Sequence, residues 1–473
     1  MGRRLEEFKP ITEGEVKMYT CGPTVWNYPH IGNYRTFLFE DLLRRFLEYR
    51  GFKVSQVMNL TDVDDRIIKI CRENNYDIYD FTEKYAKSFF EDLQFLNIER
   101  AEHYPRATQH VPEMVRIIQG LLASGVAYKG EDGSIYYRIS RFPNYGSLSG
   151  LKIEELKPGA RISQDDYTKD SAQDFALWKA WDESDGKVFW ETSLGKGRPG
   201  WHIECSAMSM RYLGEEFDIH TGGVDNIFPH HENEIAQSEA FTGKRFARYW
   251  LHSEHLLVND VKMAKRLGNF ITIKELRDRG IDGRTLRLAL LSGHYRAQLN
   301  FTEKSLEQAA STLKRIDEFM FRLDSGLASS PATETVSHAS ALDTRAEELS
   351  ESARARFLAA MDEDLDTPTA LAVVYEFISQ ANRLLDQGLV GRRGLKSLEE
   401  FMLKDFDRVF GVVKAVPLPS ELLLPEEDAL MLKQREDARA RKDWKLSDEL
   451  RTKLSGHGIE VQDTPSGQKW RRK

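Results

Sequence analysis

The sequence predicts an α/β fold in which a parallel sheet is split by an insertion and followed by a helical region and a small C-terminal unit. Strand-like runs alternate with helical patterns up to about residue 260, which is typical of parallel sheets. Turn-rich sequence separates the first two runs from the last two, and long helical patterns begin after Thr302. The runs lie near residues 16–19, 53–59, 217–220 and 250–258.

The first run leads into the segment PHIGN, residues 29–33. Apolar residues after it recur at spacings of three and four, which predicts a helix that begins near this segment. His30 and Asn33 are then expected at the helix N-terminus, where backbone N–H groups and the helix dipole favour a bound phosphate. Gly32 lets a nucleotide approach closely. A Rossmann-type nucleotide-binding sheet is therefore the predicted fold.

The middle of the chain carries a candidate metal site. In the segment PHHENE, residues 229–234, His230 and Glu234 share one helix face at i and i+4. Cys21 follows the first strand-like run, and Cys205 ends the segment GWHIEC. These four residues offer two sulfur atoms, one nitrogen and one oxygen, a set suited to zinc. The alternative is a solvated helix face together with buried cysteines that act as small hydrophobic residues.

A second candidate nucleotide-binding segment is KMAKRLGN, residues 262–269. Lys262 and Lys265 are expected on a short loop, where two mobile ammonium groups could neutralise charge on a transferring phosphate.

The last third of the chain is predicted to be helical, with a basic end. Helical patterns at 303–323 and 353–385 flank a Ser/Ala/Thr-rich stretch at 325–340, which predicts a linker. After a proline-marked break at 417–425, residues 433–473 hold 12 Lys/Arg and 7 Asp/Glu, although the whole chain has a net charge of −8. A local patch of this kind is sufficient for RNA binding.

Composition indicates a cytoplasmic protein with no membrane segment. No apolar run approaches the ~20 residues that cross a bilayer, and the start MGRRLEEFKP lacks a hydrophobic signal core. Three cysteines, Cys21, Cys71 and Cys205, are too few and odd in number for a disulfide scaffold. We expect reduced thiols or metal ligands.

Several segments of the sequence resemble those of the cysteinyl-tRNA synthetases, a family of class I aminoacyl-tRNA synthetases. The resemblance runs from about residue 6 to the end, with PHIGN as a form of the family's HIGH signature. The segments that carry it are YTCGPTV (19–25), PHIGN, KGRPGWHIEC (196–205), FPHHENEIAQ (228–237) and DTPSG (463–467).

The resemblance implies one zinc ion per chain, with ligands at Cys21, Cys205, His230 and Glu234, that binds the sulfur of L-cysteine. A pocket that judges shape alone separates such close analogues as cysteine and serine by only ~10–200-fold, whereas zinc prefers a thiolate to an alcohol. Thr61 and Trp201 match positions that line the family's amino-acid pocket. For Trp201, ordinary core packing is the alternative.

The resemblance also implies an ATP site. The PHIGN segment would hold the phosphates, and Lys262 and Lys265 would stabilise the reacting α-phosphate and the departing pyrophosphate. The segment HTGGVD (220–225) resembles the ribose and adenine pocket, in which Gly222 and Gly223 admit the nucleotide and Asp225 accepts from a hydroxyl. A simple turn is the alternative for a lone Gly-Gly-x-Asp. Mg²⁺ is expected to accompany ATP.

Transfer of the cysteinyl group implies cysteine tRNA as the partner of a monomeric enzyme. The basic tail would contact the anticodon stem-loop through stacking side chains and cations, unless it is only a solvated helix surface. The candidate contacts are Arg439, Arg441, Lys442, Trp444 and Trp470.

Six segments are expected. They are residues 1–118, the first half of the sheet; 119–199, an insertion; 200–254, the second half; 255–310, the lysine loop and a tRNA stem-contact region; 311–412, a helical bundle; and 413–473, an anticodon-binding domain.

Two departures from the family leave alternatives open. The usual KMSKS loop stands here as KMAKR, which keeps both lysines and loses both serines, and the start of the chain is shorter than usual. The alternatives are a paralogue that passes cysteine to a small amine, as mycothiol-pathway ligases do, and a catalytically silent tRNA-binding paralogue. The complete C-terminal domain argues against the first alternative, and only the altered loop supports the second.

Overall fold

The computed structural model describes residues 5–151, 174–263, 268–330, 341–388, 390–414, 426–464 and 467–472. The chain divides into two compact units, Met1–Val413 and Lys414–Lys473.

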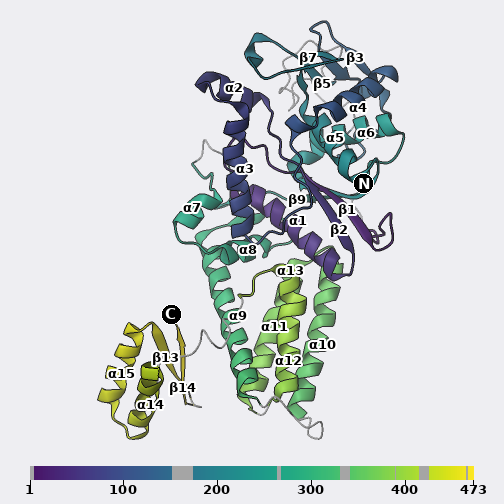
Figure 1. Ribbon diagram of the computed structural model, residues 1–473. Coiled ribbons are helices and arrows are strands. Elements are labelled where there is room, and N and C mark those ends of the chain that lie inside the picture. The colour runs from purple at the N-terminus through teal and green to yellow at the C-terminus, as the bar shows by residue number, and fades with distance from the viewer. Residues whose placement is uncertain are drawn as a thin grey trace. The chain divides into compact units, whose positions relative to one another are not determined.

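The centre of the first unit is a four-stranded parallel sheet with the order β2-β1-β8-β9 (Figure 1). The strands are β1 (Glu15–Thr20), β2 (Lys53–Met58), β8 (Phe217–Gly223) and β9 (Ala247–Ser253). The predicted α/β fold with a parallel sheet is confirmed. Because β2 lies on one side of β1 and β8 on the other, the strand order reverses at β1, and ligands of such sheets bind in the crevice at this point.

One predicted strand is wrong in extent. The run at 250–258 is not one strand, because β9 ends at Ser253 and β10 (Leu256–Val258) belongs to another sheet. The Glu254 N–H donates to the carbonyl of Tyr295 and the Leu299 N–H to that of His255. Because of these bonds, the chain after Ser253 no longer pairs with β8. The smaller sheet has the order β11-β10-β12, with β11 at Val261–Lys262 and β12 at Leu299–Phe301.

Helices connect the parallel strands. Helix α1 (Ile31–Tyr49) joins β1 to β2, and α6 (Glu232–Thr242) joins β8 to β9. The connection from β2 to β8 contains α2 (Asp65–Asn74), α3 (Ile78–Phe95), α4 (Val111–Ala123), the insertion and α5 (Trp201–Leu213).

The insertion contains an antiparallel five-stranded sheet that the turn-rich sequence did not predict. Its order is β3-β4-β5-β7-β6. Lys179 of β5 and Arg198 of β7 both bind Asp65 at the start of α2, the lysine at 3.0 Å. These ion pairs attach the insertion to the crossover after β2. The strands are β3 (Ala127–Lys129), β4 (Ile135–Tyr137), β5 (Phe175–Ala180), β6 (Trp190–Thr192) and β7 (Gly195–Pro199).

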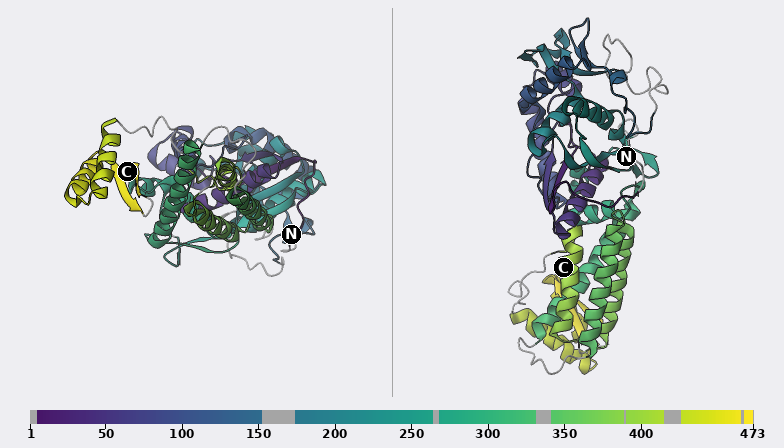
Figure 2. Two further views of the ribbon diagram at one scale, coloured as in Figure 1. Left: turned by 90° about the horizontal axis from the view of Figure 1, so that it is seen from below. Right: turned by 90° about the vertical axis from the view of Figure 1, so that its right-hand side faces the viewer.

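The rest of the first unit is helical, and its long helices run side by side in both views of Figure 2. The predicted helix at 353–385 is two helices, since Asp364 and Leu365 take left-handed backbone angles between α10 and α11. The predicted linker at 325–340 begins inside α9, and residues 331–340 lie outside the described residues. The helices are α7 (Ile273–Asp278), α8 (Gly283–Leu291), α9 (Glu303–Ser329), α10 (Ala341–Asp362), α11 (Thr367–Asp386), α12 (Arg392–Glu400) and α13 (Arg408–Phe410).

A buried arginine joins these helices to the sheet. Arg287 of α8 is fully buried and donates to Asp41 of α1 at 2.5 Å. It also donates to the carbonyls of Leu96, Asn97 and Phe410. One guanidinium therefore holds α1, α8, α13 and the end of α3 together.

Arg287→Met should lower the free energy of unfolding of the first unit by about 3–5 kcal/mol, because it leaves Asp41 with one cationic partner fewer in a buried site. Urea unfolding followed by circular dichroism measures this change. Arg279→Met is the control, since the Arg279–Glu303 pair is exposed and such pairs contribute about 0–1 kcal/mol. Equal losses in the two variants would contradict the prediction.

The second unit has its own small core. Its elements are α14 (Glu426–Ala440), α15 (Trp444–Gly456) and the hairpin β13 (Ile459–Thr464) and β14 (Gly467–Arg472). The apolar side chains that fill the core are Met431, Leu432, Leu450, Leu454, Ile459 and Val461.

None of the helices within the described ranges is long and apolar enough to span a lipid bilayer.

Candidate active site and metal centre

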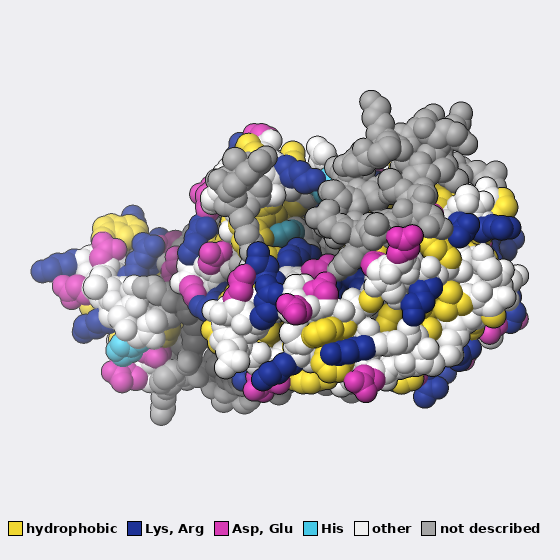
Figure 3. Space-filling model, turned by 90° about the horizontal axis from the view of Figure 1, so that it is seen from above, with side chains coloured by type: hydrophobic (Ala, Val, Ile, Leu, Met, Phe, Trp, Pro, Cys, Tyr) yellow, Lys and Arg dark blue, Asp and Glu magenta, His cyan; other side chains and the backbone are white. Residues whose placement is uncertain are grey.

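A cavity of about 460 Å³ opens at the carboxyl ends of β1 and β8, where the strand order reverses. Figure 3 shows the upper face of the molecule, on which hydrophobic side chains and a histidine are visible in a hollow between charged groups. The cavity is within the size range of small-molecule sites. Among the predicted residues, its wall includes Cys21, His30, Gly32, Asn33, Trp201, Gly223, Asp225 and Lys262.

The N-terminus of α1 forms one side of this cavity. His30 is the N-cap: its Nδ1 accepts from the Asn33 N–H at 3.2 Å, and the Asn33 side chain accepts from the His30 N–H at 3.1 Å. This reciprocal capping fixes both side chains. A Cβ on Gly32 would lie 3.0 Å from the His30 ring and 3.1 Å from the Met263 methyl group. The glycine thus keeps the helix N-terminus open to a ligand.

The end of β8 forms another side. Gly223 and Asp225 line the cavity, and Gly222 lies behind them against His231. A Cβ on Gly223 would lie 2.4 Å from the Asp225 carboxylate, and one on Gly222 would lie 2.9 Å from the His231 ring. Lys262, on β11, lines the same cavity, whereas Lys265 lies outside the described residues.

Four predicted metal ligands converge beside the cavity, and one of them, Cys21, is part of its wall. Cys21 follows β1, Cys205 is in α5, His230 precedes α6 and Glu234 is in its first turn. One ligand atom from each lies within 4.8 Å of all the others.

The orientation of these side chains suits a cation. Glu234 Oε1 lies 3.0 Å from His230 Nε2, yet this oxygen makes no hydrogen bond among the described residues. The remaining atoms are held from behind, His230 Nδ1 by His202 at 2.9 Å and Glu234 Oε2 by His220 Nε2 at 2.9 Å. Such outer partners are typical of metal ligands. The donor set therefore fits zinc.

The pKa values of these side chains also agree with a metal site. Burial lowers the pKa of His230 to about 3, so its imidazole is neutral, which is the form that binds metals. Burial raises the pKa of Glu234 to about 7. A hydrogen bond to Cys205, together with burial, raises the pKa of the Cys21 thiol well above its usual value. A dication would reverse the shifts of Glu234 and Cys21, because it favours the ionised carboxylate and thiolate, and it would keep the His230 imidazole neutral.

The structure adds histidines that the sequence analysis did not single out. Cys21, His220, His231 and Glu234 form a second group of the same size, in which the Cys21 sulfur lies 3.3 Å from His231 Nε2. His231 Nδ1 in turn lies 2.8 Å from His252 Nε2. This group offers one sulfur atom rather than two, so it suits zinc less well. The sequence did contain a signal for this histidine cluster, since six of the 12 histidines lie between residues 202 and 255.

The two predicted amino-acid contacts differ in position. Trp201 is 40% exposed, lines the cavity and stacks on His230 with a centroid distance of 4.2 Å. Its ring is therefore available to a ligand beside the metal group. Thr61 is buried and donates to Glu204 at 3.2 Å. It lies behind the cavity wall.

The predicted RNA contacts in the second unit differ in how exposed they are. Trp444 is 55% exposed, and the Arg439 guanidinium lies 5.4 Å from its ring centroid. Arg441 and Lys442 are exposed in the turn between α14 and α15. Trp470 is half-buried and packs against the core of this unit. Of the two tryptophans, Trp444 is the better stacking platform.

Comparison with known proteins places this chain in the class I aminoacyl-tRNA synthetases. Residues 7–311 match the family model of the tRNA synthetases class I (C) catalytic domain, residues 356–414 the DALR domain, and residues 423–471 the cysteinyl-tRNA ligase anticodon binding domain. A Mycobacterium tuberculosis methionyl-tRNA synthetase bound by methionyl-adenylate has the same fold, with a TM-score of 0.63 at 12% identity over 84% of this chain and 92% of that one.

The chain belongs to the cysteine–tRNA ligase family. It is 45% identical to the cysteine–tRNA ligase of Protochlamydia amoebophila over 98% of this chain and 95% of the relative. It is 46% identical to that of Chlamydia pneumoniae over 96% and 93%. The Brachyspira hyodysenteriae enzyme is 44% identical over 100% and 98%.

Proposed function

We propose that this aminoacyl-tRNA synthetase selects L-cysteine through a zinc ion held by Cys21, Cys205, His230 and Glu234. The observation that carries the proposal is the convergence of these four donors beside a cavity that Cys21 and the N-terminus of α1 line. Zinc bound there would favour a thiolate over an alcohol and so separate cysteine from serine. Trp201 would cover the bound amino acid.

The chain's own residues would position ATP for the first step. The N-terminus of α1, with His30, Gly32 and Asn33, would hold the phosphates through N–H groups and the helix dipole. Asp225 would accept a hydrogen bond from a ribose hydroxyl where Gly222 and Gly223 give the nucleotide room. We expect Mg²⁺ to enter with ATP and to bridge its phosphates.

In this step the cysteine carboxylate attacks the α-phosphorus, the bond to the bridging oxygen breaks, and pyrophosphate leaves. Negative charge grows on the phosphate oxygens, and Lys262 and Lys265 would stabilise it. The enzyme thus contributes position and electrostatics. The terminal ribose hydroxyl of cysteine tRNA then attacks the activated carboxyl group and releases AMP.

Cysteine-dependent ATP–pyrophosphate exchange followed by charging of cysteine tRNA tests this function, with serine as the competing amino acid. A silent paralogue would fail in exchange. A ligase for a small amine would pass exchange and fail in charging. Zinc analysis of the same preparation tests the metal, and light scattering tests the expected monomer.

Deleting Lys414–Lys473 should separate activation from tRNA recognition. Every proposed metal and ATP residue precedes residue 270, so exchange should stay within about twofold, whereas charging should fall sharply because phosphate contacts from Arg439, Arg441 and Lys442 are lost. Both assays on the truncated and full chains, with a salt titration of tRNA binding to the full chain, measure this. Undiminished charging by the truncated chain would show that the basic tail is only a solvated surface.

A further inference from the structure

A row of aromatic rings leads out of the cavity along α3 to the turn that precedes this helix. Tyr28 lines the cavity and contacts Tyr85 of α3 with a centroid distance of 5.2 Å. Tyr85 contacts Phe81 one helical turn earlier, also at 5.2 Å, and Phe81 stacks with Tyr76 at 6.0 Å and an interplanar angle of 16°. We call Tyr28, Tyr85, Phe81 and Tyr76 the aromatic row.

The aromatic row is exposed at the end that lies away from the cavity. Tyr28, Tyr85 and Phe81 are half-buried, whereas Tyr76, in the turn between α2 and α3, is 56% exposed. The proposed metal and ATP functions do not explain why a large aromatic side chain stands at position 76. An exposed ring that ends a continuous path into a catalytic cavity indicates a contact for something that enters it.

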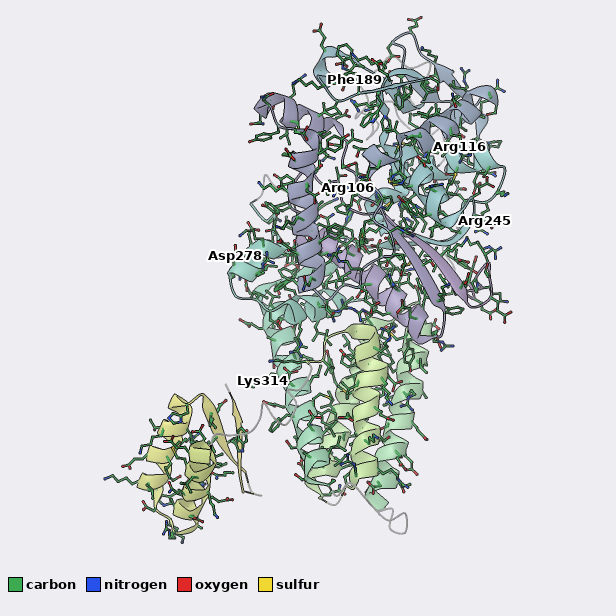
Figure 4. All side chains as sticks on the ribbon, in the orientation of Figure 1. Arg106, Arg116, Phe189, Arg245, Asp278 and Lys314 are labelled. Carbon is green, nitrogen blue, oxygen red and sulfur yellow. The ribbon has the colours of Figure 1, made fainter. Side chains whose placement is uncertain are left out.

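Cations accompany the aromatic row. Lys84 Nζ lies 5.3 Å from the Tyr85 centroid, and the Arg66 guanidinium lies 5.0 Å from the centroid of Trp26 in the cavity wall. Two acidic groups nearby are engaged elsewhere. Arg106, labelled in Figure 4, pairs with Glu83 of α3 at 2.5 Å, and Asp77 caps α3.

We infer that the aromatic row guides the single-stranded 3′ end of tRNA into the cavity, an inference that rests on the proposed function. Rings interleaved with cations are the recognition chemistry of unpaired nucleotides, because every base has a face that stacks and every phosphate attracts a cation. The transfer step requires the terminal ribose inside a cavity sized for small ligands. Only an unpaired strand can extend that far, and the aromatic row joins the cavity to the surface.

The experiment compares Tyr76→Ala with Tyr79→Ala in the full-length protein. Tyr79 is the matched control, since it lies three residues further on, is 55% exposed, and pairs with no other ring among the described residues. The affinities to be measured are those for cysteine tRNA with and without its last three nucleotides. Charging kinetics and pyrophosphate exchange complete the comparison.

Tyr76→Ala should raise the Kd and the KM for intact tRNA by roughly 5-fold or more, the effect of one lost stacking contact, and leave binding of trimmed tRNA unchanged. Tyr79→Ala should match the unmodified protein, and Tyr76→Phe should restore affinity because it keeps the ring. Pyrophosphate exchange should be the same in all variants.

Equal binding of intact tRNA by Tyr76→Ala and Tyr79→Ala would overturn the inference. So would a parallel loss of exchange in Tyr76→Ala, which would indicate a structural role, or a Tyr76-dependent dimer in light scattering, which would make the occupant a second copy. If the unmodified protein performs exchange and charging and Tyr76→Ala behaves identically, the inference fails and the proposed function stands. An unmodified protein that fails in charging removes the proposed function instead.

Discussion

Cys205→Ser should hold little zinc and should favour cysteine over serine by no more than ~10–200-fold, the range that shape alone supplies. The substitution replaces a thiolate ligand by a hydroxyl, which is a poor ligand for zinc. Because the proposed zinc ion is also the source of the selectivity, we expect metal content and selectivity to fall in the same variant. Elemental analysis and exchange assays with each amino acid measure the two effects.

Cys71→Ser is the matched control. Cys71 is also a buried free thiol, but it lies on α2 outside the ligand group. This variant should keep about one zinc ion per chain and the full preference for cysteine. An active, selective enzyme that contains no zinc would remove the argument altogether.

Lys265→Ala should lower the rate of cysteine activation by ~10²–10³-fold, the loss typical of one charge contact made in the transition state. The expectation comes from the KMAKR segment, in which both lysines of the family signature remain. Burst measurements of pyrophosphate release separate the chemical step from product release. The KM for ATP should change less than this rate, because the contact is strongest as charge develops.

The control for this variant is Lys274→Ala, which removes an exposed lysine of α7 whose partner is Asp278. It should leave the activation rate unchanged. An unchanged rate in Lys265→Ala as well would mean that Arg266 supplies the charge in its place.

The sequence predicted the central sheet well because its strand-like runs alternate with helical patterns, as in other parallel sheets. Residues 217–220, for example, belong to β8, and the helix after PHIGN begins at its predicted N-cap, His30. The sheet of the insertion escaped prediction because strands as short as Ala127–Lys129 and Ile135–Tyr137 carry too few residues to establish a period of two. The two strands pair with each other, but the next strand of the sheet, β5, begins only at Phe175.

The candidate site, like the fold, could be predicted from the sequence only in part. The spacing of His230 and Glu234 encodes their shared helix face, so local sequence was sufficient to pair them. The contacts of His220 with Glu234 and of His231 with His252 depend on the packing of α6 against β8 and β9. No local spacing records that packing. Cys21 and Cys205 were grouped with this pair as candidate thiolate ligands, and the resemblance to a family strengthened that grouping before the fold was known.

Helix α1 has a consequence for how the length of this chain can change. It carries His30, a proposed phosphate contact, at its start and Asp41, the partner of Arg287, near its middle. Each residue added between them would turn one end by about 100° relative to the other, since an α-helix has 3.6 residues per turn. Loops of the insertion can lengthen at their tips, but the interval from His30 to Asp41 can neither grow nor shrink by a single residue.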